Sequence, residues 1–181
     1  RFPNKKVFWL PNGVDLNFYN FENNSQSWKT QNGFNENDFL LLYAGIIGHA
    51  QGLEVVLKAA EYCKTNSSIK FIILGSGPEK EKLIQLKEEK MLSNVFFFPP
   101  VAKSKMPEIV SACALSIIPL KKLDLFKGAI PSKIFENLAM KKPILLGVEG
   151  EAKDLFIEDG QCGLAFEPEN GMELADRITT L

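Results

Sequence analysis

Two six-residue runs, one wholly apolar and one apolar except for Lys70, are each followed at once by a glycine, and they constrain the fold of this chain most. Phe39–Ala44 ends at Gly45, and Ile69–Leu74 ends at Gly75. Runs of this kind are typical of β-strands that are buried on both faces of a sheet. Such strands need a layer of helices on each side and crossover connections between parallel neighbours. We therefore expect a mostly parallel sheet between two helical layers.

The alternation of strand and helix continues to the end of the chain. Further strands are expected at 94–98, 115–119, 143–147 and 162–166, and helices at 53–60, 79–91, 104–113, 132–140, 152–157 and 170–181. This order predicts an α/β, doubly wound, Rossmann-like domain over residues 39–181. Residues 1–38 are expected to form an N-terminal strand at 6–10 and a connecting loop, because the segment 20–37 is rich in Asn, Ser and Gln.

Composition narrows the classes of protein to which the chain can belong. With 181 residues, 45% hydrophobic and 24% charged, it can bury the core of one domain. A net charge of -1 without a basic run argues against nucleic-acid binding, and no apolar run has the length of a membrane span. Three scattered cysteines without a metal-binding spacing suggest a reduced, cytoplasmic protein that holds no metal. The start at Arg1 and the end inside an apparent helix suggest a fragment.

Ligands of such sheets bind at the carboxyl ends of the strands, so the loops there are the candidates for a site. The loop 45–52 carries Gly45, Gly48 and Gly52, which would let backbone N–H groups approach a phosphate, although a merely tight turn explains them equally. His49, the only histidine, could bind a phosphate, act as a base or simply be solvated. Gly75 opens a second such loop, which either lines the same cleft or only turns the chain.

Two further loops belong to the same predicted edge. The aromatic residues 96–98 are expected in the core on alternating sides of a strand, and the loop 99–103 after them, including Val101, could present backbone groups to a nucleobase. The loop 121–130 mixes lysines with apolar residues; it is either a solvated face or a site that attracts a diphosphate.

The expected helix at 132–140 carries the main candidate side chain. Pro131 and a capping Ser132 would open the helix, and an apolar stripe of Ile134, Phe135, Leu138 and Ala139 would face the core. Glu136 lies about 130° from the centre of that stripe, because each helical residue advances about 100°. Its carboxylate is therefore either solvated, as is common early in a helix, or occupied by a ligand.

Five motifs in one order give the chain a resemblance to a known family. They are Pro11-Asn12-Gly13-Val14-Asp15, Tyr43-Ala44-Gly45, Leu74-Gly75-Ser76-Gly77-Pro78, the stretch 131–143, and Glu158-Asp159-Gly160 with Gly163-Leu164. Together they resemble the C-terminal, donor-binding half of a GT-B glycosyltransferase of family 4. The stretch 43–54 and the Pro-Ser-Lys at 131–133 are similar to bacterial N-acetyl-L-fucosamine-type transferases of surface polysaccharide synthesis.

The resemblance implies a nucleotide-sugar donor, most simply UDP-linked, and a retaining transfer without a cofactor or bound metal. Glu136 would bind the ribose as the second glutamate of the E-x7-E motif. Donor nucleotide contacts would also come from Gly45, Gly48, His49, Gln51, Gly52, Gly75, Val101, Ser132 and Lys133. A glycan or lipid-linked acceptor would bind to a missing N-terminal domain, and the full-length enzyme could associate peripherally with the cytoplasmic face of a membrane.

The chain departs from the family pattern at two places. Gly128 stands where the first glutamate of E-x7-E would contact the donor sugar, which leaves Gly128, Ala129 and Ile130 as the sugar-side segment. Ile46 and Gln51 stand near the places of the usual diphosphate-binding Arg and Lys. Lys133 or Lys127 could compensate by position. A non-catalytic nucleotide-sugar-binding module and a GT-B sugar-nucleotide epimerase remain as alternatives, although a single histidine argues against the epimerase.

Overall fold

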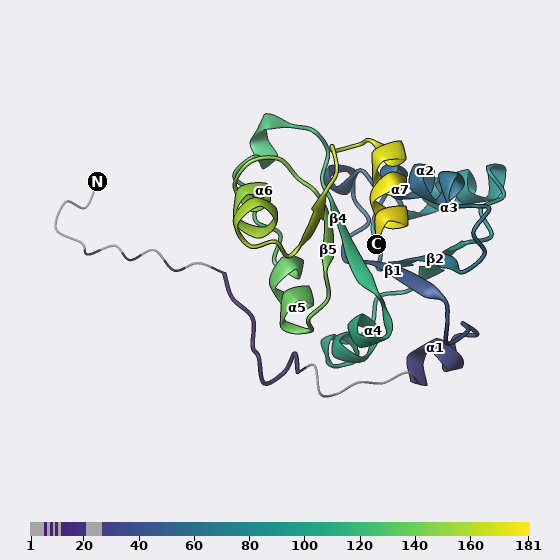
Figure 1. Cartoon of the computed structure of the whole chain (residues 1–181), viewed down its shortest axis with the longest axis horizontal. Helices are drawn as coiled ribbons and strands as arrows, with labels where there is room; N and C mark the ends of the chain where they lie inside the picture. The colour runs from purple at the N-terminus through teal and green to yellow at the C-terminus, as the bar shows by residue number, and fades with distance from the viewer. Residues whose placement is uncertain (1–5, 7, 9, 11, 21–26) are drawn as a thin grey trace.

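The computed structural model describes residues 6, 8, 10, 12–20 and 27–181 (Figure 1). Its centre is a parallel sheet of six strands in the order β3-β2-β1-β4-β5-β6. The strands are β1 (Phe39–Ala44), β2 (Ile69–Leu74), β3 (Val95–Phe98), β4 (Leu115–Pro119), β5 (Ile144–Gly147) and β6 (Gly163–Ala165). Along the chain, β2 and β3 are added on one side of β1, and β4, β5 and β6 are then added on its other side. The predicted doubly wound Rossmann-like fold is therefore confirmed, with its switch point between β1 and β4.

Helices connect the strands and cover both faces of the sheet (Figure 1). They are α1 (Ser27–Gln31), α2 (Glu54–Tyr62), α3 (Lys80–Glu89), α4 (Met106–Ala112), α5 (Lys133–Ala139), α6 (Glu151–Lys153) and α7 (Gly171–Thr180). Short 3-10 turns lie at η1 (His49–Gln51), η2 (Lys103–Lys105) and η3 (Asp124–Phe126), and a π-helical stretch forms η4 (Asp154–Asp159).

The core is divided by the sheet because successive side chains of a strand point to opposite faces. Leu41 and Tyr43 of β1 pack with α2, α3 and α7 on one face. Leu40 and Leu42 pack on the other face, where residues of α1 and α4 join them. A third cluster, which includes Ile134 of α5, fills the space beneath α5 and α6. All four of these β1 side chains are at most 1% exposed, as expected for a strand that is covered on both sides.

The predicted connection at 20–37 is wrong in part, because it contains the helix α1. Trp28 and Phe34 of this segment are buried. The ring centre of Trp28 lies 5.3 Å from that of Phe98, and Phe34 lies 5.0 Å from Phe96, edge to face. Because the segment is mostly polar, its composition did not indicate that these two side chains would be buried. They are stabilised by contacts with residues that are distant in the sequence. The expected strand at 6–10 lies partly outside the described residues.

The predicted helix at 152–157 also differs from the structure. Only three residues form α6, and the π-helical η4 follows directly. A π-turn holds an extra residue, so the apolar spacing that suggests an α-helix does not distinguish the two. Two backbone hydrogen bonds end this stretch. Gly160 N–H donates to the Ile157 carbonyl, and Cys162 N–H donates to the Phe156 carbonyl at 2.9 Å.

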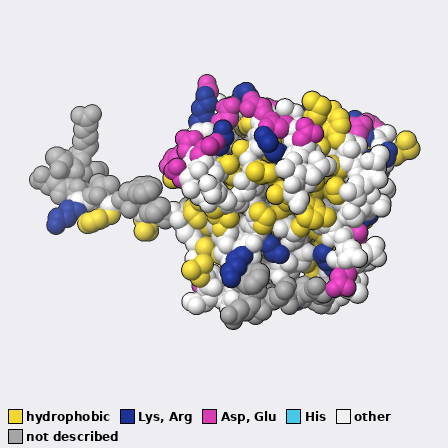
Figure 2. Space-filling model, in the orientation of Figure 1, with side chains coloured by type: hydrophobic (Ala, Val, Ile, Leu, Met, Phe, Trp, Pro, Cys, Tyr) yellow, Lys and Arg dark blue, Asp and Glu magenta, His cyan; other side chains and the backbone are white. Residues whose placement is uncertain are grey.

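The surface view agrees with the nearly balanced charge of the chain. Figure 2 shows Asp and Glu side chains gathered towards the upper edge of the face in view, whereas Lys and Arg side chains are dispersed over it. Over the coloured residues of this face, the cations do not form the continuous basic patch that a nucleic-acid surface needs. Among the described residues, no helix combines the length and apolarity required to cross a bilayer.

Candidate functional site

A cleft of about 470 Å³ lies at the carboxyl ends of β1, β2 and β3. Four of the residues singled out in the sequence line it, namely Gly45, Gly75, Val101 and Glu136. The remaining lining residues are Tyr19, Ala44, Ile46, Leu74, Ser76, Pro100, Lys103 and Met106. The predicted convergence of three loops with the Glu136 helix at one edge of the sheet is thus found in the structure.

Glu136 reaches this cleft from the first turns of α5. Its side chain is half-buried, and the adjacent Asn137 is 5% exposed. Asn137 lies outside the predicted apolar stripe and is nevertheless buried: its side chain accepts a hydrogen bond from Ser116 of β4 and donates one to the Lys133 carbonyl. The helix is therefore fixed against the sheet directly beside the carboxylate.

Two expectations about α5 are wrong. Ser132 occupies the N-cap position, but its side chain makes no capping hydrogen bond, because its backbone is already helical (φ -58, ψ -28). Phe135 is only half-buried, and its ring lies edge to face with Phe156 at 5.6 Å. The helix is so short that its apolar side packs partly against α6 and η4, at the rim of the third core cluster.

Tyr19 is a site residue that the sequence did not reveal. It is 3% exposed, it lines the cleft, and the charge of Glu136 acts on its hydroxyl. Burial, followed by the charge of Glu136, raises the pKa of Tyr19 to about 12. A turn positions it, in which Tyr19 N–H donates to the Asp15 carbonyl at 2.9 Å. Its nearest sequence signal is the Asn-Gly turn at 12–13, which says nothing about a contact with residue 136.

The glycine loops after β1 and β2 are locked together. Gly45 N–H donates to the Leu74 carbonyl, and a β-carbon at Gly75 would lie 1.9 Å from the Gly45 carbonyl oxygen. A β-carbon at Gly77 would similarly lie 2.3 Å from the Ile47 carbonyl oxygen. Gly75 therefore lines the cleft and does not merely turn the chain.

Lys133 lies beneath Gly45. Its Nζ atom is 4.2 Å from the centre of the Tyr43 ring and 3.0 Å from the position that a Gly45 β-carbon would occupy. Burial lowers the pKa of Lys133 to about 8, and the charge of Glu136 opposes that shift only partly. The Tyr43 hydroxyl donates to the Ile46 carbonyl, which holds the loop above both side chains.

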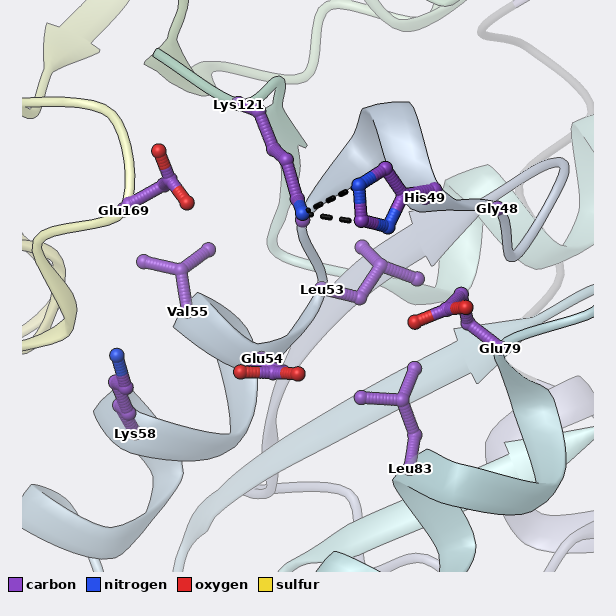
Figure 3. Close-up of a pocket in the computed structure, with 11 residues that line it drawn as sticks. Gly48, His49, Leu53, Glu54, Val55, Lys58, Glu79, Leu83, Lys121 and Glu169 are labelled. Atoms are coloured by element: carbon purple, nitrogen blue, oxygen red, sulfur yellow. Dashed lines mark hydrogen bonds between the residues drawn. The ribbon is translucent and has the colours of Figure 1, made fainter.

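The remaining residues of the first glycine loop line a different, smaller pocket (Figure 3). Gly48, His49 and Gly52 surround about 60 Å³ together with Lys121. The Lys121 ammonium lies 2.9 Å from Nε2 of His49, so the imidazole points towards this cation (Figure 3). Gln51 is half-buried, with its Oε1 atom 2.9 Å from the position of a Gly48 β-carbon. The structure thus divides the predicted phosphate loop between two cavities.

The sugar-side segment lies on the loop between β4 and α5. Gly128 is exposed, and a β-carbon there would meet no atom within 4 Å, while Ala129 and Ile130 are half-buried. Glu151 N–H donates to the Lys127 carbonyl at 2.8 Å, which ties this loop to the start of α6. Within the described part of the chain, no three His, Cys, Asp or Glu side chains form a group that could hold a metal ion.

Comparison with known proteins identifies the fold's family. The profile of the family described as "Glycosyl transferases group 1" matches residues 24–181. This chain belongs to that family. A protein of Escherichia coli (strain K12), "Putative colanic acid biosynthesis glycosyl transferase WcaI", is 30% identical over 105 residues, 58% of this chain and 25% of that protein. "Alpha-D-kanosaminyltransferase" of Streptomyces kanamyceticus is 29% identical over 147 residues, 78% of this chain and 36% of that protein.

Solved structures agree with the GT-B architecture of this family. The structure of Anabaena Alr3699/HepE "in complex with UDP and glucose" superposes with a TM-score of 0.77 at 22% identity, covering 93% of this chain and 45% of that one. Staphylococcus aureus TarM superposes with a TM-score of 0.67 at 23% identity, covering 80% and 28%. At such identities the likeness shows the fold. This chain spans less than half the length of each of these four proteins.

Proposed function

We propose that this chain is the donor-binding part of a glycosyltransferase. It binds a nucleotide sugar, with UDP as the leaving group, and the sugar is transferred with retention of its anomeric configuration. The observation that carries the proposal is the half-buried carboxylate of Glu136 in a cleft that is lined by the glycine loops of β1 and β2. A carboxylate accepts hydrogen bonds from ribose hydroxyls, and backbone N–H groups at the strand ends suit phosphates.

The names of the relatives support this proposal. HepE is described in complex with UDP and glucose, and the TarM complex contains UDP with an α-GlcNAc-glycerol. WcaI is named for colanic acid biosynthesis. We therefore propose a glycan or lipid-linked acceptor in polysaccharide synthesis, of the kind handled by N-acetyl-L-fucosamine-type transferases. The acceptor would bind to another part of the protein, in the cytoplasm or at the cytoplasmic face of a membrane.

The chemistry that this chain would supply is binding and charge stabilisation. Glu136 would orient the nucleoside, and donors around Gly45 would stabilise the charge that develops on the departing diphosphate. Val101 lies beside the cleft and could contact the base. Gly128 has no side chain with which to contact the sugar, so that contact would come from Ala129, Ile130 or backbone groups. Ser132, Gln51 and the pocket of Gly48, His49 and Gly52 remain candidates for contacts nearer the phosphates.

Nucleotide titration tests the proposal. We expect the 181-residue chain to bind UDP in isothermal titration calorimetry, with a modest affinity because closure of a second domain normally completes such a cleft. EDTA should leave this affinity unchanged if no metal is needed. Absence of UDP binding, or equal affinity for UDP and for inorganic diphosphate, would contradict the proposal.

A transfer assay separates an enzyme from a binding module. The open surroundings of Gly128 favour the module as the second candidate, because they offer no acidic side chain to the sugar. We expect the chain by itself to bind UDP without transferring sugar, and the full-length protein to transfer it. UDP-sugar binding by the full-length protein without transfer to any acceptor would favour the module.

A further inference from the structure

Lys133 is a half-buried lysine whose ammonium has few partners. Its Nζ atom lies 4.2 Å from the Tyr43 ring centre, a cation–π contact. Among residues 12–20 and 27–181, Lys133 takes part in none of the salt bridges, and Glu136 acts on it through charge attraction. An ammonium has three N–H donors, and no salt bridge of the described residues uses those of Lys133. An anion in the cleft would supply acceptors for them.

Gly45 leaves this cation uncovered on the side of the cleft. Gly45 is exposed and lines the cleft, and its φ of +145 lies in a region that favours glycine. A β-carbon at this position would come within 3.0 Å of Lys133 Nζ and 3.7 Å of the Tyr43 hydroxyl. Lys133 does not itself line the cleft, and the absence of a side chain at Gly45 leaves only the backbone of this glycine at the place between them.

The other cations near this edge are engaged or peripheral. Lys127 is exposed and paired with Asp124 at 2.7 Å. Lys121 is directed towards His49 in the smaller pocket (Figure 3). Lys103 lines the cleft, but its exposed ammonium lies over the Phe18 ring at 5.7 Å. Among the cations named here, only Lys133 combines partial burial, proximity to Gly45 and the absence of a salt bridge.

We propose that Lys133 is the cation that binds the diphosphate of the nucleotide donor, which it reaches past the backbone of Gly45. This inference rests on the proposed function and adds to it the group that neutralises the phosphates. The uncharged residues Ile46 and Gln51 follow β1, near the places where the family usually has its diphosphate-binding cations. The positive charge would instead come from Lys133 at the start of α5, on the far side of the switch point. One short helix then holds both ends of the nucleotide, with Glu136 at the ribose and Lys133 at the phosphates.

Titrations with UDP and uridine test the assignment. Lys133→Met keeps the length of the side chain and removes its charge, and we expect it to lower the affinity for UDP about ten- to a hundredfold. Uridine binding, followed by ligand-observed NMR, should change less than twofold, because uridine has no phosphate. Lys127→Met is the matched control and should leave both affinities unchanged.

A pH series gives a readout that a structural role would not move. Phosphate binding favours the charged ammonium, so UDP affinity should fall as the pH rises from 7 to 9.5, with proton uptake on binding. Two titratable groups act on Lys133: Glu136 through its charge, and Tyr43 through contact with its ring. Tyr19 in turn interacts with Glu136. Burial raises the pKa of both tyrosines above their ordinary values, so neither titrates in this range. Lys133→Arg should restore binding and flatten the profile.

The outcomes are distinguishable. If the unaltered chain does not bind UDP, the proposed function fails and this inference fails with it. If the unaltered chain binds UDP and Lys133→Met binds it within twofold, only the inference is overturned. Equal losses of UDP and uridine affinity in Lys133→Met would also overturn it, because they would mean general damage to the cleft.

Discussion

The hydroxyl of Ser116 donates a hydrogen bond to the side-chain oxygen of Asn137 at 2.6 Å, and both residues are about 5% exposed or less. This contact joins the middle of the sheet to α5. The amide nitrogen of Asn137 donates to the Lys133 carbonyl at 2.8 Å, so the same side chain also stabilises the first turn of the helix. Both proposed nucleotide-binding side chains, Lys133 and Glu136, therefore depend on a polar contact inside the core.

Asn137→Ala should destabilise the fold and weaken nucleotide binding together. It leaves the buried Ser116 hydroxyl without its partner, which costs about 1–3 kcal/mol. Urea unfolding measures this cost, and UDP titration measures the effect on the site. The double variant Ser116→Ala/Asn137→Ala should lose less than the sum of the single variants. Additive losses would show that the two side chains act independently.

Glu136→Gln and Glu136→Ala should weaken UDP binding without altering the stability of the ligand-free chain. A charge-assisted hydrogen bond to a hydroxyl is worth about 1.5–3 kcal/mol, or roughly ten- to a hundredfold in affinity. Calorimetry with UDP and thermal unfolding without it provide the two readings. Glu88→Gln, on the exposed side of α3, is the control. Unchanged UDP affinity, or an unfolded Glu136→Ala chain, would refute a ligand-binding role.

Ile134→Ala should cost more stability than Phe135→Ala, although phenylalanine is larger. Ile134 is fully buried, and its truncation should cost about 2–5 kcal/mol. If Phe135 were in the core, as sequence periodicity predicts, its truncation would cost about 3–5 kcal/mol of stability. The half-buried ring seen here reduces that expectation to about 2 kcal/mol, in proportion to the area removed from water. Denaturant midpoints of the two variants decide the order.

Gly48→Val should harm UDP binding more than His49→Ala if backbone N–H groups of this loop contact the phosphates. The added β-carbon would lie 2.9 Å from Oε1 of Gln51, so that side chain must move. His49 is exposed, and its removal frees Lys121 without disturbing the backbone. A larger loss in His49→Ala would assign the contact to the imidazole instead.

The stability of the chain should rise between about pH 8 and pH 10.5 because of Lys133. Its pKa is lowered to about 8 in the folded state from an ordinary value of 10.5. In this interval the unfolded chain binds the additional proton, so the unfolding free energy increases with pH. The difference between the unaltered chain and Lys133→Met isolates this contribution from that of other groups. An identical pH slope in both proteins would contradict it.

Much of the fold could be predicted from local patterns. The predicted bounds of β1, β2 and β4 coincide with those observed, because each is a mostly apolar run with clear ends. The small helix α1 could not be predicted in this way. Its segment is polar, and it is held by Trp28 and Phe34, whose partners lie more than sixty residues away in the chain.

The site was predictable where it depends on strand ends and not where it depends on packing. Gly45, Gly75, Val101 and Glu136 meet at one cleft because parallel strands end at one edge. Tyr19 reaches Glu136 only through the folding of residues 12–20 against the domain, for which no periodicity exists. The buried amide of Asn137 was equally hidden, since helical spacing reports which residues face the core and not which polar groups find partners there.

The backbone contact between the loops of Gly45 and Gly75 limits how this protein can diversify. A side chain at Gly75 would displace the backbone of Gly45, and a side chain at Gly45 would displace Lys133. The two loops therefore cannot vary independently at these glycines. If the chain binds a nucleotide sugar as proposed, changes in donor preference would enter more easily through the segments 99–103 and 120–131, where a β-carbon at Gly128 would meet no atom within 4 Å. An engineer who wants a new donor sugar should therefore randomise those two segments and leave the glycine loops untouched.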